Sequence, residues 1–309
     1  MRGTTSPNPP VGCAIVGPRG DIIATGGTSP AGGAHAEVNA LRAAGDRVRG
    51  ATAVVTLEPC NHTGRTGPCS RALVEAGIAH VIYLTADPNP QAAGGANYLR
   101  AHGVQVTHEP VRVEALQPWL AGVRQGRVCV TAKFAATVDG FTAAPDGTSQ
   151  WITGREARDH VHADRSLRDA IIIGTGTALA DNPSLTARHP DGSLMDHQPR
   201  RVVVGKRTVG GGNLGRLGFE QYPTPGEALA TLWDTGARDV LVEGGAGLLT
   251  SVVEMGVVDR IQAYVSPLLL GGGRPVVERA LAGTLADARR YTLSGATVLG
   301  NDVLIEMER

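Results

Sequence analysis

The sequence predicts an α/β protein with two domains, and three observations support that prediction. The chain has 309 residues, whereas a single domain typically has about 100–200. Short runs of Val, Ile and Leu alternate with segments whose apolar residues have helical spacing, which is typical of a sheet covered by helices. The 42 glycines suit tight turns between such strands and helices.

The first predicted domain, residues 1–124, starts with a hairpin. Two apolar runs, 11–16 and 21–26, are separated by Gly-Pro-Arg-Gly, which favours a turn between paired strands. Further strands are expected at 51–57, 80–85 and 104–107, and helices at 36–44, 70–76, 96–102 and 111–124. This alternation predicts a sheet that is covered on both faces.

The second predicted domain, residues 127–309, follows a short linker, "RQGR" at 124–127. Strands are expected at 128–135, 169–174, 200–205, 239–245, 260–267 and 302–307, and helices at 155–165, 226–236 and 247–256. The segment "TVGGGNLGRLGFEQYPTPG" (208–226) is rich in glycine and is expected to be a loop.

Charge and hydropathy argue against several classes of protein. The formal net charge is zero, with 29 basic and 29 acidic residues and no basic run, so neither nucleic acid nor an anionic membrane is an expected partner. No apolar stretch approaches the ~20 residues that span a bilayer. The N-terminal "MRGTTSPNPPVG" lacks the apolar core of a signal peptide, so a cytoplasmic protein is expected. Four cysteines in a chain of this length favour metal binding or catalysis over a disulfide scaffold.

Three separated pieces of sequence predict a catalytic zinc site. His35-Ala36-Glu37 stands at the start of a predicted helix, Pro59-Cys60 follows a buried strand, and Cys69 precedes the next helix. Zinc deaminases hold their metal with His and two Cys and use a nearby Glu as the proton carrier; their signature is H-x-E followed by P-C-x-x-C. Here eight residues separate the cysteines instead of two, and this loop-like insert still lets both sulfurs converge.

Plainer interpretations of these residues also exist. A His-x-Glu at a helix start is commonly a solvated cap, and buried cysteines commonly act as small apolar side chains. A structural zinc site would need a fourth ligand, for which His62 is the nearby candidate, and it would leave Glu37 without a role. The three pieces in this order favour the catalytic site.

A second motif, "VEGGAGLLTS" (242–251), predicts a phosphate-binding turn. It consists of a strand, a glycine turn and a helix start, an arrangement that exposes backbone N–H groups to a phosphate. It does not match G-x-G-x-x-G, so an ordinary strand-to-helix turn remains the alternative. Lys133 and Glu243 lie in or end apolar strands, where burial without a purpose would be unfavourable, so we interpret them as substrate-ordering or proton-handling groups.

The chain resembles the bifunctional riboflavin biosynthesis proteins, in which a pyrimidine deaminase is fused to a pyrimidine reductase. In the first half the resemblance rests on "TTSPNPPVGCAIV", "HAEVNALRAAG", "VTLEPCNHTGRTGPC" and "DPNP". In the second half it rests on "AKFAATVDGFTA", "SQWITGREAR", "IIIGTGTALADNPSLTAR", "LVEGGAGLL" and "VSPLLLGG". The longer spacing between cysteines, including "GRTGPC", is this family's own variant of the deaminase motif.

The resemblance implies a cytidine-deaminase-like three-layer α/β/α domain followed by a dihydrofolate-reductase-like α/β domain. It implies zinc-dependent deamination of 2,5-diamino-6-ribosylamino-4(3H)-pyrimidinone 5′-phosphate, then reduction of the ribosyl group to ribityl by NADPH. It also implies a homodimer or larger homo-oligomer that pairs through the second domain.

The same resemblance assigns site residues in both domains. Zinc would be held by His35, Cys60 and Cys69, with Glu37 as the catalytic proton carrier, and Asn8 and Arg65 would hold the pyrimidine and the phosphate. In the second domain Lys133 and Glu243 are expected to be catalytic on the separate ground given above, their polar character in apolar strands. Its substrate residues would be Ser149, Arg165, Leu185, Arg188 and Glu243. Its cofactor residues would be Ala135, Trp151, Thr177, Asp181, Lys206, Gly245, Ala246, Gly247, Leu248, Leu249, Thr250 and Ser251.

Three departures from the family pattern bear on these expectations. Family members usually have a helix before "TTSPNP", where this sequence has only Met1-Arg2-Gly3; either the natural start lies upstream or the helix is missing. Gly205-Lys206 stands where Asp-Ser is usual near the cofactor 2′-phosphate, which Lys206 could still pair with. The segment 206–227 is short by about one strand. The alternative to a bifunctional enzyme is therefore a deaminase whose second domain is only a dimerisation scaffold.

Overall fold

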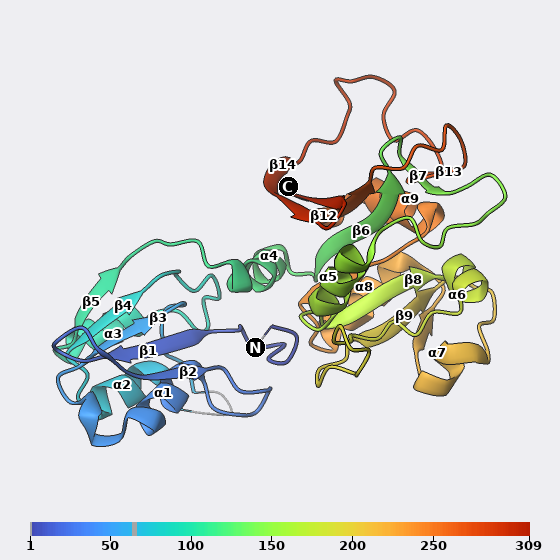
Figure 1. The fold of residues 1–309 in the computed structure, drawn as a ribbon. Coiled ribbons are helices and arrows are strands. Elements are labelled where there is room, and N and C mark those ends of the chain that lie inside the picture. The colour runs from blue at the N-terminus through green and yellow to red at the C-terminus, as the bar shows by residue number, and fades with distance from the viewer. Residues whose placement is uncertain (1, 64–66) are drawn as a thin grey trace. The chain divides into compact units, whose positions relative to one another are not determined.

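The computed structural model describes residues 2–63 and 67–309 and divides the chain into two compact units (Figure 1). One unit comprises Met1–Gly126 and the other Arg127–Arg309. Each has its own sheet and its own hydrophobic core, so each is described separately.

The first unit is built on a five-stranded sheet with the order β2-β1-β3-β4-β5. Its strands are β1 (Gly12–Val16), β2 (Ile22–Gly27), β3 (Thr52–Val55), β4 (His80–Tyr83) and β5 (Gln105–His108). β1 pairs antiparallel with β2 and β3, whereas β3, β4 and β5 are parallel. The carboxyl ends of the parallel strands therefore open at one edge, where α/β sheets place their ligand sites.

Helices on both faces complete the three-layer α/β/α arrangement of this unit (Figure 1). They are α1 (Ala36–Ala44), η1 (Gly45–Val48), α2 (Cys69–Glu75), α3 (Gly95–Ala101), η2 (Glu114–Leu116) and α4 (Gln117–Gln125). The core consists mainly of small and aliphatic side chains; Ile15, Leu73 and Leu99, for example, are completely buried. This matches the low aromatic content of the sequence.

The second unit has an eight-stranded sheet with the order β10-β9-β8-β11-β6-β12-β15-β14. The strands are β6 (Cys129–Thr137), β8 (Ala170–Gly174), β9 (Arg200–Val204), β10 (Glu220–Tyr222), β11 (Asp239–Val242), β12 (Val258–Ser266), β14 (Thr292–Leu299) and β15 (Asp302–Glu308). The run from β10 to β12 is parallel, and β12, β15 and β14 pair antiparallel. A small second sheet pairs β7 (Phe141–Ala143) with β13 (Arg274–Pro275).

Helices pack on both faces of this sheet. They are α5 (Arg155–Arg165), α6 (Thr175–Asp181), α7 (Gly212–Leu217), α8 (Pro225–Asp234) and α9 (Ala246–Glu254). Successive residues of a strand point to opposite faces of its sheet. In β8, Ile172 packs with α8 and α9, whereas Ile171 and Ile173 pack with α6 and α7. The near-continuous apolar run "AIIIG" is therefore explained by burial on both sides.

Two segments of the chain differ from the sequence-based expectations. The glycine-rich segment 208–226, expected to be a loop, contains α7 and the edge strand β10. The helix expected at 111–124 begins at Gln117 after the short turn η2, because Pro118 occupies its first turn, where proline opens a helix. Within residues 2–63 and 67–309, no helix combines the length and apolar character needed to cross a membrane.

Candidate active sites

The three predicted zinc ligands converge in the first unit. His35 is the N-cap residue of α1, Cys60 lies in the loop after β3, and Cys69 is the first residue of α2. Their potential ligand atoms all lie within 4.8 Å of one another. His35 Nδ1 is 3.5 Å from Cys60 Sγ and 3.3 Å from Cys69 Sγ. One imidazole and two thiols at these separations fit a zinc ion that keeps a fourth position open.

The geometry also explains how the long insert between the cysteines is accommodated. The backbone N–H of Cys69 donates to Cys60 Sγ at 3.4 Å, and the N–H of Ser70 donates to the Cys60 carbonyl. The start of α2 is thereby fixed against the loop that carries Cys60. The hydrogen bond with the Cys69 side chain is the largest of several effects that lower the pKa of Cys60 to about 4. A thiolate, the form that binds metal, is thus favoured at Cys60.

Glu37 is not a solvated helix cap. Only 4 % of the residue is exposed, and it lies in the first turn of α1 beside the ligand cluster. His35 makes no side-chain capping hydrogen bond either. Burial raises the pKa of Glu37 to about 7, which lets this carboxyl group both accept and release a proton near neutral pH.

A pocket opens over these residues. Asn8, His35, Glu37 and Cys60 line it, and the individual roles assigned to them stay predictions. His62 also lines the pocket, but among the described residues it does not join the converging ligand atoms, which argues against a four-ligand structural site. Arg65 lies outside the described residues, so its predicted contact stays a prediction.

Three further residues of this pocket were not assigned a role from the sequence. Asp87 and Asn89 line the pocket, and they belong to the quoted "DPNP" segment, which was the available signal. Trp119 of α4 also lines the pocket, and its indole N–H donates to the carbonyl of Pro7 at 3.0 Å. That bond connects α4 to the segment that carries Asn8.

A larger pocket in the second unit brings together many of the predicted reductase residues. Ten of them line it: Lys133, Ala135, Ser149, Trp151, Arg165, Thr177, Asp181, Leu185, Arg188 and Glu243. They come from β6, α5, α6 and the segments after β7, α6 and β11. The roles assigned to them individually stay predictions.

A buried ion cluster forms the floor of this pocket. Both oxygens of Glu243 accept from the Arg165 guanidinium, at 2.6 and 2.8 Å, and Lys133 Nζ lies 3.7 Å from the same carboxylate. Burial alone would raise the pKa of Glu243, but the charges of Arg165 and Lys133 more than offset this and hold it at about 2. Burial lowers the pKa of Lys133, and Glu243 only partly counteracts that shift. An ionised Glu243 therefore faces an ammonium group that loses its proton more readily than a solvated lysine.

The glycine turn predicted to meet cofactor phosphates follows β11 and leads into α9. Gly245 is the N-cap residue of α9, and a Cβ placed there would lie 3.3 Å from Thr177 Oγ1. Thr177 lines the pocket, so the turn lies directly beside it. Glycine is favoured where the backbone closely approaches a ligand, and the N-terminus of a nine-residue helix suits a phosphate.

The other residues assigned to this turn differ in how they could meet a cofactor. Leu248 and Leu249 are 8 % and 2 % exposed, so contact is limited to their backbone. Thr250 is fully buried; its hydroxyl donates to the Ala246 carbonyl and accepts from the N–H of Glu278. The Ser251 hydroxyl donates to the carbonyl of Gly247. The side chains of Thr250 and Ser251 thus stabilise α9 itself.

Lys206 is exposed just after β9 and is not among the residues that line the pocket. Its neighbour Arg207 lies closer to α6: the Arg207 Nε donates to Thr175 Oγ1 at 3.4 Å. The predicted contact of Lys206 with the cofactor 2′-phosphate stays a prediction.

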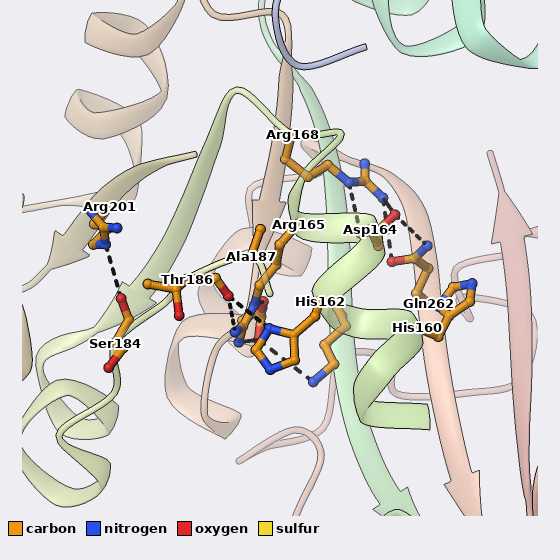
Figure 2. Close-up of polar contacts among 12 residues, drawn as sticks. His160, His162, Asp164, Arg165, Arg168, Ser184, Thr186, Ala187, Arg201 and Gln262 are labelled. Atoms are coloured by element: carbon orange, nitrogen blue, oxygen red, sulfur yellow. Dashed lines mark hydrogen bonds and ion pairs between the residues drawn. The ribbon is translucent and has the colours of Figure 1, made fainter. Parts of the chain in front are cut away.

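Sequence reasoning missed His162 and Arg158, which also line the second pocket. Both belong to α5, as does Arg165, and Figure 2 shows the His162 ring and the Arg165 guanidinium group projecting from this helix. The signal was available: positions 158, 162 and 165 are four and three residues apart and share one helical face.

Comparison with protein-family models matches both units. The RibD C-terminal domain family matches residues 128–210 and 220–305. The cytidine and deoxycytidylate deaminase zinc-binding region matches residues 1–85, which include Glu37 and all three candidate zinc ligands.

Relatives and solved structures match nearly the whole chain. The riboflavin biosynthesis protein RibD of Corynebacterium ammoniagenes is 60 % identical over 296 residues, covering 93 % of this chain and 88 % of that protein. The RibD protein of Mycobacterium tuberculosis is 46 % identical, covering 99 % and 93 %. A deaminase/reductase structure from Thermotoga maritima has a TM-score of 0.89 at 30 % identity, and Acinetobacter baumannii RibD has 0.87 at 35 %; each match covers 99 % of this chain and 94 % of the other. The chain therefore belongs to the RibD family, the bifunctional deaminase/reductases of riboflavin biosynthesis.

Proposed function

We propose that the two units catalyse successive steps on one phosphorylated pyrimidine. The first would remove an exocyclic amine from a diaminohydroxyphosphoribosylaminopyrimidine, and the second would reduce the resulting 5-amino-6-(5-phosphoribosylamino)uracil. These compounds are named for the Thermotoga maritima relative. The observation that supports the first step most strongly is a buried Glu37 beside three converging zinc ligands. For the second step it is the Lys133–Glu243–Arg165 cluster in a pocket next to a glycine turn.

In the first unit His35, Cys60 and Cys69 would hold zinc, which makes water nucleophilic at neutral pH. Glu37 would accept the proton from the attacking water and deliver a proton to the leaving amine. Its burial supports this role, because a carboxyl group with a pKa near neutral can serve as both base and acid. Asn8 would hold the pyrimidine at the mouth of the pocket.

In the second unit NADPH would supply a hydride to C1′ of the ribosyl group. The C1′–O4′ bond breaks in that reduction, and O4′ must gain one proton. Lys133 is suited to provide it, because burial lowers the pKa of its ammonium group. Glu243 would orient Lys133, and Arg165 would hold Glu243 in the ionised form. Arg188 would bind the 5′-phosphate, for which a guanidinium is well shaped.

The bifunctional assignment is tested by measuring both products in one preparation. Purified protein with zinc should release ammonia from the diamino substrate and should then oxidise NADPH in a 1:1 ratio to the ammonia released. A titration of NADPH followed by tryptophan fluorescence should saturate in the absence of substrate. Ammonia release without any NADPH binding at high micromolar concentration would instead favour a scaffold role for the second unit.

The proposed compartment is the cytoplasm, where reducing conditions keep cysteine ligands as thiols. All four cysteines are free in the structure, which is consistent with that proposal. The proposed assembly is a homodimer or larger homo-oligomer that pairs through the second unit. Exposed apolar side chains on the edge strand β14, such as Leu293 and Val298, support it. Light scattering after size-exclusion chromatography would test the proposed assembly, and a monomer would contradict it.

A further inference from the structure

His162 lies in the reductase pocket without an assigned role. It is half-buried on α5, one turn before Arg165, and it lines the same pocket as Lys133 and Glu243. Figure 2 shows its ring beside the Arg165 side chain, with both groups directed at the backbone of Thr186. The Thr186 carbonyl accepts from Arg165 at 3.1 Å and is 2.9 Å from His162 Nδ1.

The contact with Thr186 determines which tautomer of His162 is present. A carbonyl oxygen can only accept, so Nδ1 must carry the hydrogen. Burial lowers the pKa of His162, and the neighbouring charges of Arg165 and Arg188 act in the same direction, whereas the Thr186 carbonyl and Glu243 oppose it. The ring is therefore neutral at neutral pH, and its Nε2 is a hydrogen-bond acceptor.

Nε2 has no hydrogen-bond partner among residues 2–63 and 67–309, and it is not a buried atom deprived of one. It is therefore accessible from the pocket that His162 lines. A neutral Nε2 cannot pair with a phosphate oxygen, because both are acceptors. It can pair with a hydroxyl or amino group of a ligand.

Most charged groups that line the pocket are hydrogen-bond donors, so a neutral acceptor at His162 can bind ligand hydroxyl groups that they cannot. Lys133, Arg158, Arg165 and Arg188 are donors. Glu243 already accepts from Arg165 through both oxygens. Asp181, the other carboxylate that lines the pocket, is exposed at the end of α6 and is assigned to the cofactor. A sugar chain carries hydroxyl groups that must each find an acceptor when they leave water.

We propose that His162 binds the substrate of the reductase by accepting a hydrogen bond at Nε2 from a hydroxyl of the ribosyl group. This inference rests on the proposed reductase function and adds a substrate-positioning residue to it. His162 has two contacts in this account: Nδ1 fixes the ring on Thr186, and Nε2 recognises the sugar.

The two nitrogens can be separated by substitution. The amide nitrogen of His162→Asn can replace Nδ1 and preserve the bond to Thr186, but the variant has no group at the position of Nε2. The amide of His162→Gln extends further and can present its oxygen near that position. His162→Ala removes both contacts. His189→Asn is the matched control, because His189 is exposed and its hydrogen bonds in the turn are made by its backbone.

Four quantities are measured for each variant. They are KM for 5-amino-6-(5-phosphoribosylamino)uracil, the inhibition constants of ribose 5-phosphate and inorganic phosphate, and Kd for NADPH. We expect His162→Asn to raise KM and the ribose 5-phosphate constant roughly 3- to 10-fold, the loss expected for one neutral hydrogen bond. The phosphate constant and the NADPH Kd should stay within 2-fold of the unaltered enzyme, about the scatter of such assays. His162→Gln should recover part of the loss, and His189→Asn should match the unaltered enzyme.

Two results would overturn the inference. If His162→Asn matches the unaltered enzyme while His162→Ala is impaired, His162 only fixes the Thr186 segment. If the inhibition constants of ribose 5-phosphate and phosphate rise together, the contact is with the phosphate instead of the sugar. Failure of the unaltered enzyme to oxidise NADPH is a different outcome, because it would contradict the proposed reductase and the inference with it.

Discussion

At the scale of single residues, the burial of Glu37 distinguishes a reactive carboxyl group from a helix cap. The sequence alone permitted both interpretations, because a His-x-Glu pair at a helix start occurs in either. In the structure Glu37 lines the pocket beside His35 and Cys60 with 4 % exposure, and the His35 side chain makes no capping hydrogen bond. A group this buried beside three potential metal ligands has a geometry suited to proton transfer.

Glu37→Gln is expected to abolish ammonia release while zinc remains bound. The amide has nearly the same shape but cannot accept and return a proton, so the rate should fall by about 10²–10⁴-fold. Ammonia release and the zinc content by elemental analysis are measured on the same sample. Zinc near one equivalent with ammonia release close to that of the unaltered enzyme would refute the proposed role of Glu37.

The pKa of Glu243 predicts a pH-dependent contribution to stability. Its pKa in the folded protein, about 2, lies below the ordinary value of 4.5. The contribution of the ionised group is therefore complete above pH 4.5 and is lost as the pH falls toward 2. The difference in Tm between the unaltered protein and Glu243→Gln should shrink over that range when measured by circular dichroism. A difference that stays constant from pH 6 to pH 3 would contradict the proposed ion cluster.

At the scale of elements, the zinc site depends on how closely α3 approaches the loop that carries Cys60. A Cβ on Gly95, the first residue of α3, would lie 1.8 Å from the carbonyl oxygen of Pro59. Glu58 strengthens the same junction, because its carboxylate accepts from the backbone N–H groups of Gly94 and Ala96. The position of Cys60 is thus fixed by a helix that contributes no ligand.

Gly95→Ala is expected to displace Pro59 and Cys60 and to weaken zinc binding. Overpacking of this kind destabilises a protein by about 1–3 kcal/mol. Zinc retention against a chelator and the free energy of unfolding in urea would be measured together. Gly210→Ala is the control, since a Cβ there meets nothing within 4 Å. Unchanged zinc retention in Gly95→Ala would show that this contact does not position Cys60.

The elements also show what the sequence could and could not predict. The helices 36–44 and 155–165 have the predicted bounds; Gly45 ends the first and Gly154 precedes the second. α7 was missed because it is short, contains two glycines and buries only Leu214, and β10 was missed because its three residues include no buried one. β14 was missed because it is exposed on both faces, so it has no alternating pattern. Gly300-Asn301, a hairpin turn before β15, was the overlooked signal.

At the scale of the whole molecule, each candidate site lies entirely within one unit. The residues that line the zinc pocket all belong to the first unit, and those that line the reductase pocket all belong to the second. The zinc ligands could be predicted from a short motif, whereas the reductase pocket depended on resemblance, because its residues are scattered over more than 100 positions. Chemistry at one site should therefore be separable from chemistry at the other.

The most direct test of the bifunctional account is a pair of single variants assayed for both reactions. Glu37→Gln should lose ammonia release but reduce supplied 5-amino-6-(5-phosphoribosylamino)uracil at the normal rate. Lys133→Met should release ammonia normally but oxidise NADPH at least about 100-fold more slowly, the usual loss of a proton-transfer group. If either variant lost both activities while remaining folded, or if Lys133→Met still oxidised NADPH at the normal rate, the assignment of one reaction to each unit would be contradicted.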